Sequence, residues 1–77
     1  MPMPDIWGKE YQNFLTNLKI ARKSAKMTQQ EVAKALGKHQ SFIAKCENGE
    51  RRVDIVELSK FAAIYGKTLS YFLKERP

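Results

Sequence analysis

Apolar residues recur at spacings of three and four along most of this chain, which is the period of a helix with one buried face. The first such stripe predicts a helix over about Lys9 to Ala25. Its apolar members are Tyr11, Phe14, Leu15, Leu18 and Ala25. Arg22 follows Leu18 by one helical turn and lies on the same stripe, so its charge must reach solvent or find a partner.

A second helix begins at a clear N-terminal signal. Thr28 and Glu31 form a capping box, in which each side chain satisfies a backbone N–H of the first turn. Its buried side consists of Val32, Ala33 and Leu36. Gly37 supplies the left-handed residue that ends the helix.

A third helix is predicted from about Gln40 to Asn48, where Asn48-Gly49 ends it. At 100° per residue the helix has two different faces. The inner face carries Ile43, Cys46 and Glu47. The outer face carries Ser41, Ala44, Lys45 and Asn48, so it is polar, has small residues and lacks an acid.

The fourth helix begins at a second box-like cap, Asp54 with Glu57, and ends at Gly66. Its apolar stripe is Ile55, Leu58, Phe61, Ala62 and Tyr65. A short fifth helix is expected at about Thr68 to Lys74. The pattern predicts an all-α fold, a compact bundle of five helices over residues 9–77 that follows an N-terminal arm of residues 1–8.

Composition excludes several classes of function. With 77 residues, one Cys46 and one His39, the chain cannot form an internal disulfide or a multi-ligand Cys/His metal site, and we expect no metal or cofactor. It lacks paired carboxylates and a Gly-rich phosphate loop, so we expect no enzyme. No run approaches the roughly 20 apolar residues of a membrane helix. The chain start lacks the order of a secretion signal, so a cytoplasmic protein without a membrane partner is expected.

The charge is uneven. Of the net charge of +6, residues 9–52 alone account for +6, with ten basic and four acidic residues. Such an excess in the middle of a domain is typical of a surface that faces a polyanion, although a basic solvated surface would look the same.

The helix, turn and helix from Thr28 to Gly49 have the layout of a helix-turn-helix. The segments Met27–Ala33, Leu36–Gly37 and Glu47–Arg52, together with Ile43, resemble the phage-repressor/Cro (XRE-like) DNA-binding family. The resemblance covers about Leu15 to Leu73. It implies a lambda-repressor-like fold with the helix-turn-helix at helices 2 and 3, and double-stranded DNA as the partner.

The resemblance also implies residue roles. Base edges in the major groove would be read by Gln40, Ser41, Ala44 and Lys45. The DNA phosphates would be contacted by Gln29, Asn48, Arg51 and Arg52. Arg22 and Glu47 would join in a structural ion pair, since a buried charge needs such a partner. The polar residues could instead be ordinary solvated side chains, and the two arginines an ordinary loop.

The chain departs from the family pattern at three positions. Lys26 stands where the family often has Gly, so a left-handed backbone there would be mildly strained. His39 caps the third helix, where Ser or Thr is usual and caps better. Phe42 replaces a small polar residue, and it fits packing or a dimer contact better than a DNA contact.

The leading hypothesis is a sequence-specific transcriptional regulator, a repressor-type protein that binds a palindromic operator as a homodimer. Its dimer surface would lie at Tyr71, Phe72 and Leu73, or in the arm at Ile6 and Trp7. The alternative is a protein-binding module such as an antitoxin or a coactivator. A module of that kind need not keep the outer face of its third helix free of acids. Because this chain has no acid on that face, the pattern favours a DNA-binding protein.

Overall fold

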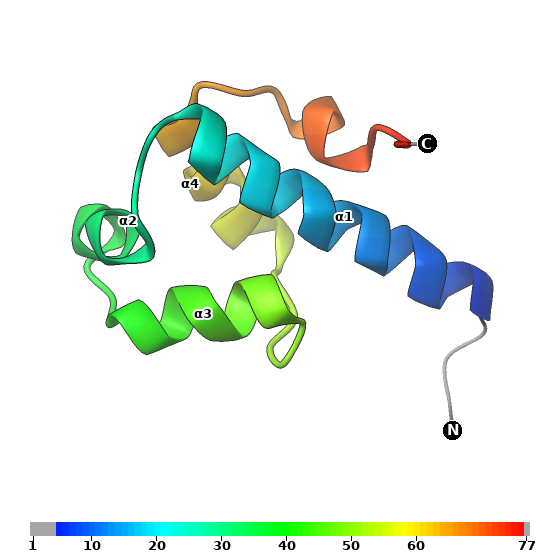
Figure 1. The fold of residues 1–77 in the computed structure, drawn as a ribbon, viewed down its shortest axis with the longest axis horizontal. Coiled ribbons are helices and arrows are strands. Elements are labelled where there is room, and N and C mark those ends of the chain that lie inside the picture. The colour runs from blue at the N-terminus through cyan, green and yellow to red at the C-terminus, as the bar shows by residue number, and fades with distance from the viewer. Residues whose placement is uncertain (1–4, 77) are drawn as a thin grey trace.

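The domain is built from helices that pack around one long N-terminal helix. The computed structural model describes residues 5–76, without the side chains of residues 5–7. Its elements are α1 (Asp5–Ser24), α2 (Gln29–Leu36), α3 (Gln40–Asn48), α4 (Ile55–Tyr65) and the 3-10 helix η1 (Leu69–Leu73). In Figure 1, α1 crosses the molecule, with η1 along one side of it and α3 along the other.

The structure corrects one predicted boundary and one predicted helix type. Helix α1 begins at Asp5 rather than at about Lys9, so residues 5–8, which we assigned to an arm, are helical. The predicted fifth α-helix is a 3-10 helix, a form used for short segments of this kind. Over residues 5–76 the fold is therefore an all-α domain of four α-helices and one 3-10 helix.

The helix ends follow the sequence signals. Thr28 and Glu31 exchange both hydrogen bonds of a capping box, at 3.1 and 2.8 Å. Gly37 ends α2 in the left-handed region at φ 68°. Gly49 does the same for α3 at φ 78°, a backbone conformation that favours glycine, and a Cβ there would lie only 3.0 Å from the Leu15 side chain, which would have to move. Lys26 has φ 57°, the strained conformation expected of it.

The core lies between α1 and the remaining elements. Its fully buried apolar side chains include Leu18, Val32, Ile43, Phe61 and Phe72. The predicted stripe of α4 is wrong at one end, because Ile55 is 66% exposed. Ile55 is the first residue of α4, and it lines a surface groove together with residues of α1 and η1 rather than the core.

The sequence pattern also missed buried residues of α1. Asn17 is fully buried, and its amide donates to the carbonyl oxygens of Phe72 and Lys74 at 2.9 and 2.8 Å. These bonds hold η1 against α1, and the Phe72 side chain is fully buried. From the sequence we expected exposed apolar surface at Tyr71, Phe72 and Leu73. Because Phe72 is buried, this exposed surface belongs mainly to Leu73, which is 73% exposed. The side chains of Ile6 and Trp7 lie outside the described part of the chain.

Candidate nucleic-acid interface

Helices α2 and α3 are joined by residues 37–39, and they pack against each other and against the core. The left-handed Gly37 turns the chain sharply after α2. His39 is the N-cap residue of α3 but makes no side-chain capping bond, as its side-chain type led us to expect. This connection leaves the outer side of α3 facing solvent.

The exposed side of α3 carries the residues predicted to read bases. Gln40, Ser41 and Lys45 are exposed, and Ala44 is half-buried. The acid of this helix, Glu47, is only 2% exposed. The solvent face of α3 therefore offers amide, hydroxyl and ammonium groups with no carboxylate to repel a phosphate backbone. Asn48 is exposed at the C-terminal end of the same helix.

The buried Glu47 carboxylate forms an ion pair with Arg22 of α1. Arg22 donates from Nε to Glu47 Oε2 at 2.7 Å and from Nη2 to Oε1 at 3.1 Å. Its Nη1 donates to the Met27 carbonyl oxygen at 3.0 Å. This two-pronged ion pair ties the end of α1 to the inner side of α3 and satisfies a nearly buried carboxylate.

A chain of side-chain amides leads from this ion pair to the surface. Gln29 donates from Nε2 to Glu47 Oε1 at 3.0 Å, and its Oε1 accepts from Gln40 Nε2 at 2.6 Å. One N–H of Gln40 is thus committed to Gln29, and the amide retains a second N–H and its oxygen. Gln29 and Gln40, which we expected to contact a phosphate and a base separately, are joined and oriented from the core.

A hollow of about 680 Å³ lies beside the start of α2, and its lining is basic. Arg22, Lys23 and Lys26 line it from the α1 side, and Gln29 and Gln40 from the other. The first N–H groups of α2 and these cations make the region favourable to an anion. We did not single out Lys23 or Lys26 as site residues from the sequence, although three cations over residues 22–26, just before a capped helix, signal such a surface.

The two arginines of the loop after α3 contact side chains of other elements of the domain. Arg51 donates from Nη1 to Glu57 Oε1 at 2.8 Å, and its guanidinium lies 4.7 Å from the centre of the Phe42 ring. The arginine lowers the pKa of the Glu57 carboxyl, as does the backbone N–H of Asp54. Arg52 stacks over the ring of Tyr11 at 4.6 Å. Both predicted phosphate-contacting arginines are exposed, and the sequence did not reveal the carboxylate partner of Arg51.

Cys46, a free cysteine, is part of the core. Cys46 is fully buried, and burial raises the pKa of its thiol. Within residues 5–76, no three His, Cys, Asp or Glu side chains gather in a way that could hold a metal ion. None of the helices described is both long and apolar enough to cross a membrane.

A short turn between two helices, with an exposed acid-free second helix beside a basic hollow, defines a helix-turn-helix protein. The helix-turn-helix family model matches residues 18–72. A solved structure of an "XRE-family like protein" from Pseudomonas syringae pv. tomato str. DC3000 superposes with a TM-score of 0.83 and is 40% identical. That match covers 90% of this chain and 84% of the other. A comparison with curated proteins gave no match.

The chain therefore belongs to the XRE helix-turn-helix family and has its lambda-repressor-like fold. It is a DNA-binding domain of a family that is not enzymatic.

Proposed function

We propose that this protein is a sequence-specific transcriptional regulator that binds double-stranded DNA in the cytoplasm as a homodimer on a palindromic operator. The observation that carries the proposal is the solvent face of α3, whose acid is buried and paired while its polar residues are exposed. A helix of this kind fits the major groove, where donor and acceptor patterns distinguish the base pairs.

The proposed base-reading residues are those of the first two turns of α3. Gln40 offers an amide that can pair with adenine, and Lys45 a donor for guanine. Ser41 can bond either kind of base edge, and Ala44 can contact a thymine methyl group. Because Gln40 is tied through Gln29 to buried Glu47, its amide enters the groove already oriented.

The proposed phosphate contacts flank this helix. Gln29 lies at the N-terminus of α2. Asn48 is the last residue of α3, and Arg51 and Arg52 lie in the loop that follows it. Such contacts position the protein and carry no base preference. Arg51 shares its charge with Glu57, so we expect its contribution to the salt dependence of binding to be smaller than that of an unpaired cation.

Gln40→Ala tests the assignment. Affinity for the preferred duplex should fall by about 1–3 kcal/mol, and discrimination at one base-pair position should be lost. Gln12→Ala is the matched control, because Gln12 is an exposed glutamine of α1 outside the interface. Binding is measured by fluorescence anisotropy on duplexes with all four base pairs at each position. An equal loss on every duplex would make Gln40 a backbone contact and refute its role as a reader.

A further inference from the structure

The ring of Phe42 contacts two cations. Lys38 Nζ lies 5.2 Å from the centre of the ring, and the guanidinium carbon of Arg51 lies 4.7 Å from it. Both distances are within the roughly 6 Å over which a cation is attracted to the face of an aromatic ring. Phe42 belongs neither to the proposed base-reading residues nor to the proposed phosphate contacts, so its aromatic side chain needs another explanation.

The two cations come from opposite ends of the base-reading helix. Lys38 lies in the turn between α2 and α3, two residues before Gln40, and Arg51 lies in the loop that follows α3. Phe42 is in the first turn of α3, about one helical turn before Lys45 of the solvent face. The ring therefore connects the turn before α3 with the loop after it, along one edge of that face.

Packging of the ring and a second partner of Arg51 make this arrangement well defined. Phe42 is half-buried and packs against the core beside a small hollow of about 80 Å³, which Leu36 and Phe61 also line. Glu57 accepts a hydrogen bond from Arg51 Nη1 at 2.8 Å. A guanidinium has five N–H donors, so Arg51 can keep this bond and still donate to a phosphate.

Lys38 is an exposed residue whose ammonium lies at an uncharged partner. A carboxylate partner would offset the charge of the lysine, whereas a neutral ring restricts the side chain and leaves its full charge in place. An ammonium group also has three N–H donors that can bond a phosphate oxygen. Lys38 is therefore both ordered and available to an anion.

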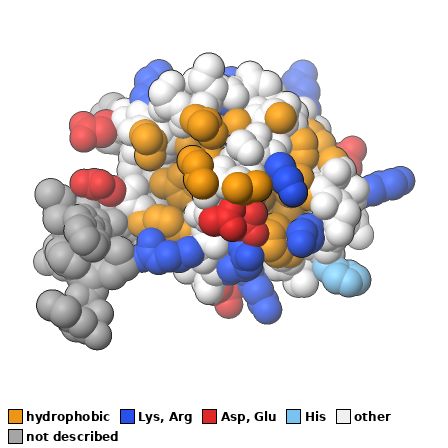
Figure 2. Space-filling view, turned by 180° about the vertical axis from the view of Figure 1, so that it is seen from behind, with side chains coloured by type: hydrophobic (Ala, Val, Ile, Leu, Met, Phe, Trp, Pro, Cys, Tyr) orange, Lys and Arg blue, Asp and Glu red, His pale blue; other side chains and the backbone are white. Residues whose placement is uncertain are grey.

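The charge around the ring favours a phosphate backbone. Of the described residues that line the hollow, the acid is Glu57, and it is paired with Arg51. Lys38 and Lys60 line the same hollow. On the face opposite to that of Figure 1, Lys and Arg side chains likewise lie around acidic ones (Figure 2). The carboxylate beside Phe42 is thus outweighed by nearby cations, and the local field attracts an anion.

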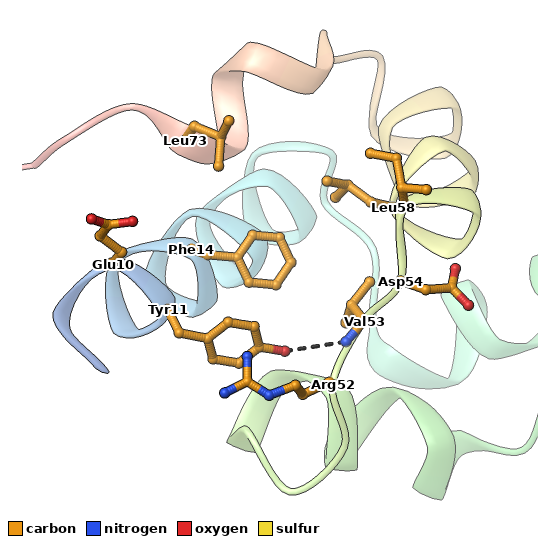
Figure 3. A pocket seen from close by; sticks show the side chains of 9 residues that line it. Glu10, Tyr11, Phe14, Arg52, Val53, Asp54, Leu58 and Leu73 are labelled. Carbon is orange, nitrogen blue, oxygen red and sulfur yellow. Dashed lines mark hydrogen bonds between the residues drawn. The ribbon is translucent and has the colours of Figure 1, made fainter. Parts of the chain in front are cut away.

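A second aromatic ring contacts the next residue of the loop. The guanidinium carbon of Arg52 lies 4.6 Å from the centre of the Tyr11 ring (Figure 3). The Tyr11 hydroxyl oxygen accepts a hydrogen bond from the Val53 backbone N–H at 3.2 Å, which ties the loop to α1. Contact between a basic side chain and an aromatic ring is therefore repeated in the loop after α3, and Lys38 extends it to the turn before α3.

We propose that Lys38 contacts a DNA phosphate, and that Phe42 is a positioning residue that orders Lys38 and Arg51 for the phosphate backbone before DNA binds. The inference rests on the proposed function, because it adds a contact and a positioning residue to the same DNA surface. Long basic side chains lose rotamer freedom when they bind a phosphate, and a ring that already restricts them lowers this cost. Phe42 acts through the two cations and touches no base.

Lys38→Met tests the new contact without disturbing the core, because Lys38 is exposed. Affinity should fall by about five- to tenfold on every duplex, and the slope of log K against log salt should decrease by about 0.9, the share of one phosphate contact. Lys60→Met is the matched control, since it removes an exposed cation of the same hollow from α4 and should leave affinity and slope unchanged. Wild-type affinity and slope in Lys38→Met, or equal effects of both variants, would overturn the contact.

Phe42→Leu and Phe42→Tyr test the positioning role. Phe42→Leu keeps an apolar side chain but removes the ring, and it should lower affinity by about three- to tenfold on every duplex. Its salt slope should stay that of wild type, because no cation is lost. Phe42→Tyr keeps the ring and should bind as wild type does. In the Lys38→Met background, Phe42→Leu should lose about half of its effect on log affinity, since one of the two ordered cations is absent.

Urea unfolding of each variant gives the folded fraction, so that affinity is compared per folded molecule. If Phe42→Leu is largely unfolded, Phe42→Met, which also lacks a ring, takes its place. A folded variant without the ring that binds as wild type does would overturn the positioning role. Phe42→Tyr that binds as weakly as Phe42→Leu would overturn it as well.

The same binding measurements separate this inference from the proposed function. Wild-type protein that binds no duplex would refute the proposed function and this inference with it. Wild-type protein that binds a preferred duplex, with unchanged affinity in Lys38→Met and Phe42→Leu, would refute this inference alone. Because phosphate contacts carry no base preference, the test is decisive on any duplex that the protein binds.

Discussion

Breaking the ion pair between Arg22 and Glu47 should destabilise the domain strongly. The loss of stability should be larger when Arg22 is replaced than when Glu47 is replaced. Arg22→Met removes both prongs of the pair and leaves Glu47, only 2% exposed, with Gln29 as a neutral donor. A nearly buried carboxylate without a cation costs about 3–5 kcal/mol. A domain of this length has a total stability of about 4–11 kcal/mol, so this loss would remove a large part of that stability.

Removal of the other partner should cost less. After Glu47→Leu, Arg22 keeps its bond to the Met27 carbonyl oxygen, and its side chain is already 14% exposed beside the basic hollow. We expect a loss of about 2–3 kcal/mol, which is typical of a hydrogen bond to a charged group. The double variant leaves no unpaired buried charge and should return to within about 1–2 kcal/mol of wild type.

Urea unfolding of the two single variants and the double variant gives the coupling between the partners, expected to be at least about 3 kcal/mol. Lys23→Met is the control, because it removes an exposed cation from the adjacent position of α1 and should change stability by less than about 0.5 kcal/mol. Additive losses, or an Arg22→Met loss below about 1 kcal/mol, would refute the reasoning, since an exposed ion pair behaves in that way.

Three further predictions concern strain, burial and pH. Lys26→Gly should raise stability by about 0.5–1 kcal/mol in urea unfolding, because Lys26 has φ 57°; a loss would mean that the left-handed backbone carries no strain. Tyr65→Phe should leave stability unchanged or raise it by about 1 kcal/mol, since the buried Tyr65 hydroxyl has no hydrogen-bond partner within the described residues; a clear loss would reveal one. The capping bonds to Thr28 lower the pKa of Glu31 from its ordinary 4.5, so this stability is present above that pH and lost as the pH falls through the folded-state pKa. Glu31→Gln, which can still cap, should make the urea midpoint fall less between about pH 5 and about pH 3, and an unchanged slope would contradict this.

The helix caps and the left-handed residues could be predicted from the sequence because each depends on a few adjacent residues. The caps at Thr28 and Asp54 form both bonds of their boxes in the structure. The left-handed Gly37 and Gly49, and the strained Lys26, also lie where the pattern places them. In each case the backbone N–H groups or the φ angle restrict the choice of residue at that position.

The errors arose where a residue depends on a distant partner. Asn17 was passed over because it is polar, although it shares a helix face with Phe14 and Leu18, and its buried amide bonds to η1. Ile55 fits the period of α4 but is 66% exposed. The ion pair between Arg51 and Glu57 joins a loop to a helix, and the local sequence pattern does not predict it.

Selection of bound sites from random duplex DNA tests the central claim most directly, which is that the exposed face of α3 reads a base sequence. The selected duplexes should share two inverted half-sites whose centres lie about one helical turn, ~34 Å, apart. The same selection with Gln40→Ala should lose preference at one position in each half-site and keep the spacing. Recovery of duplexes with no shared sequence would contradict base reading by α3, and a single half-site without its inverted copy would contradict the dimer.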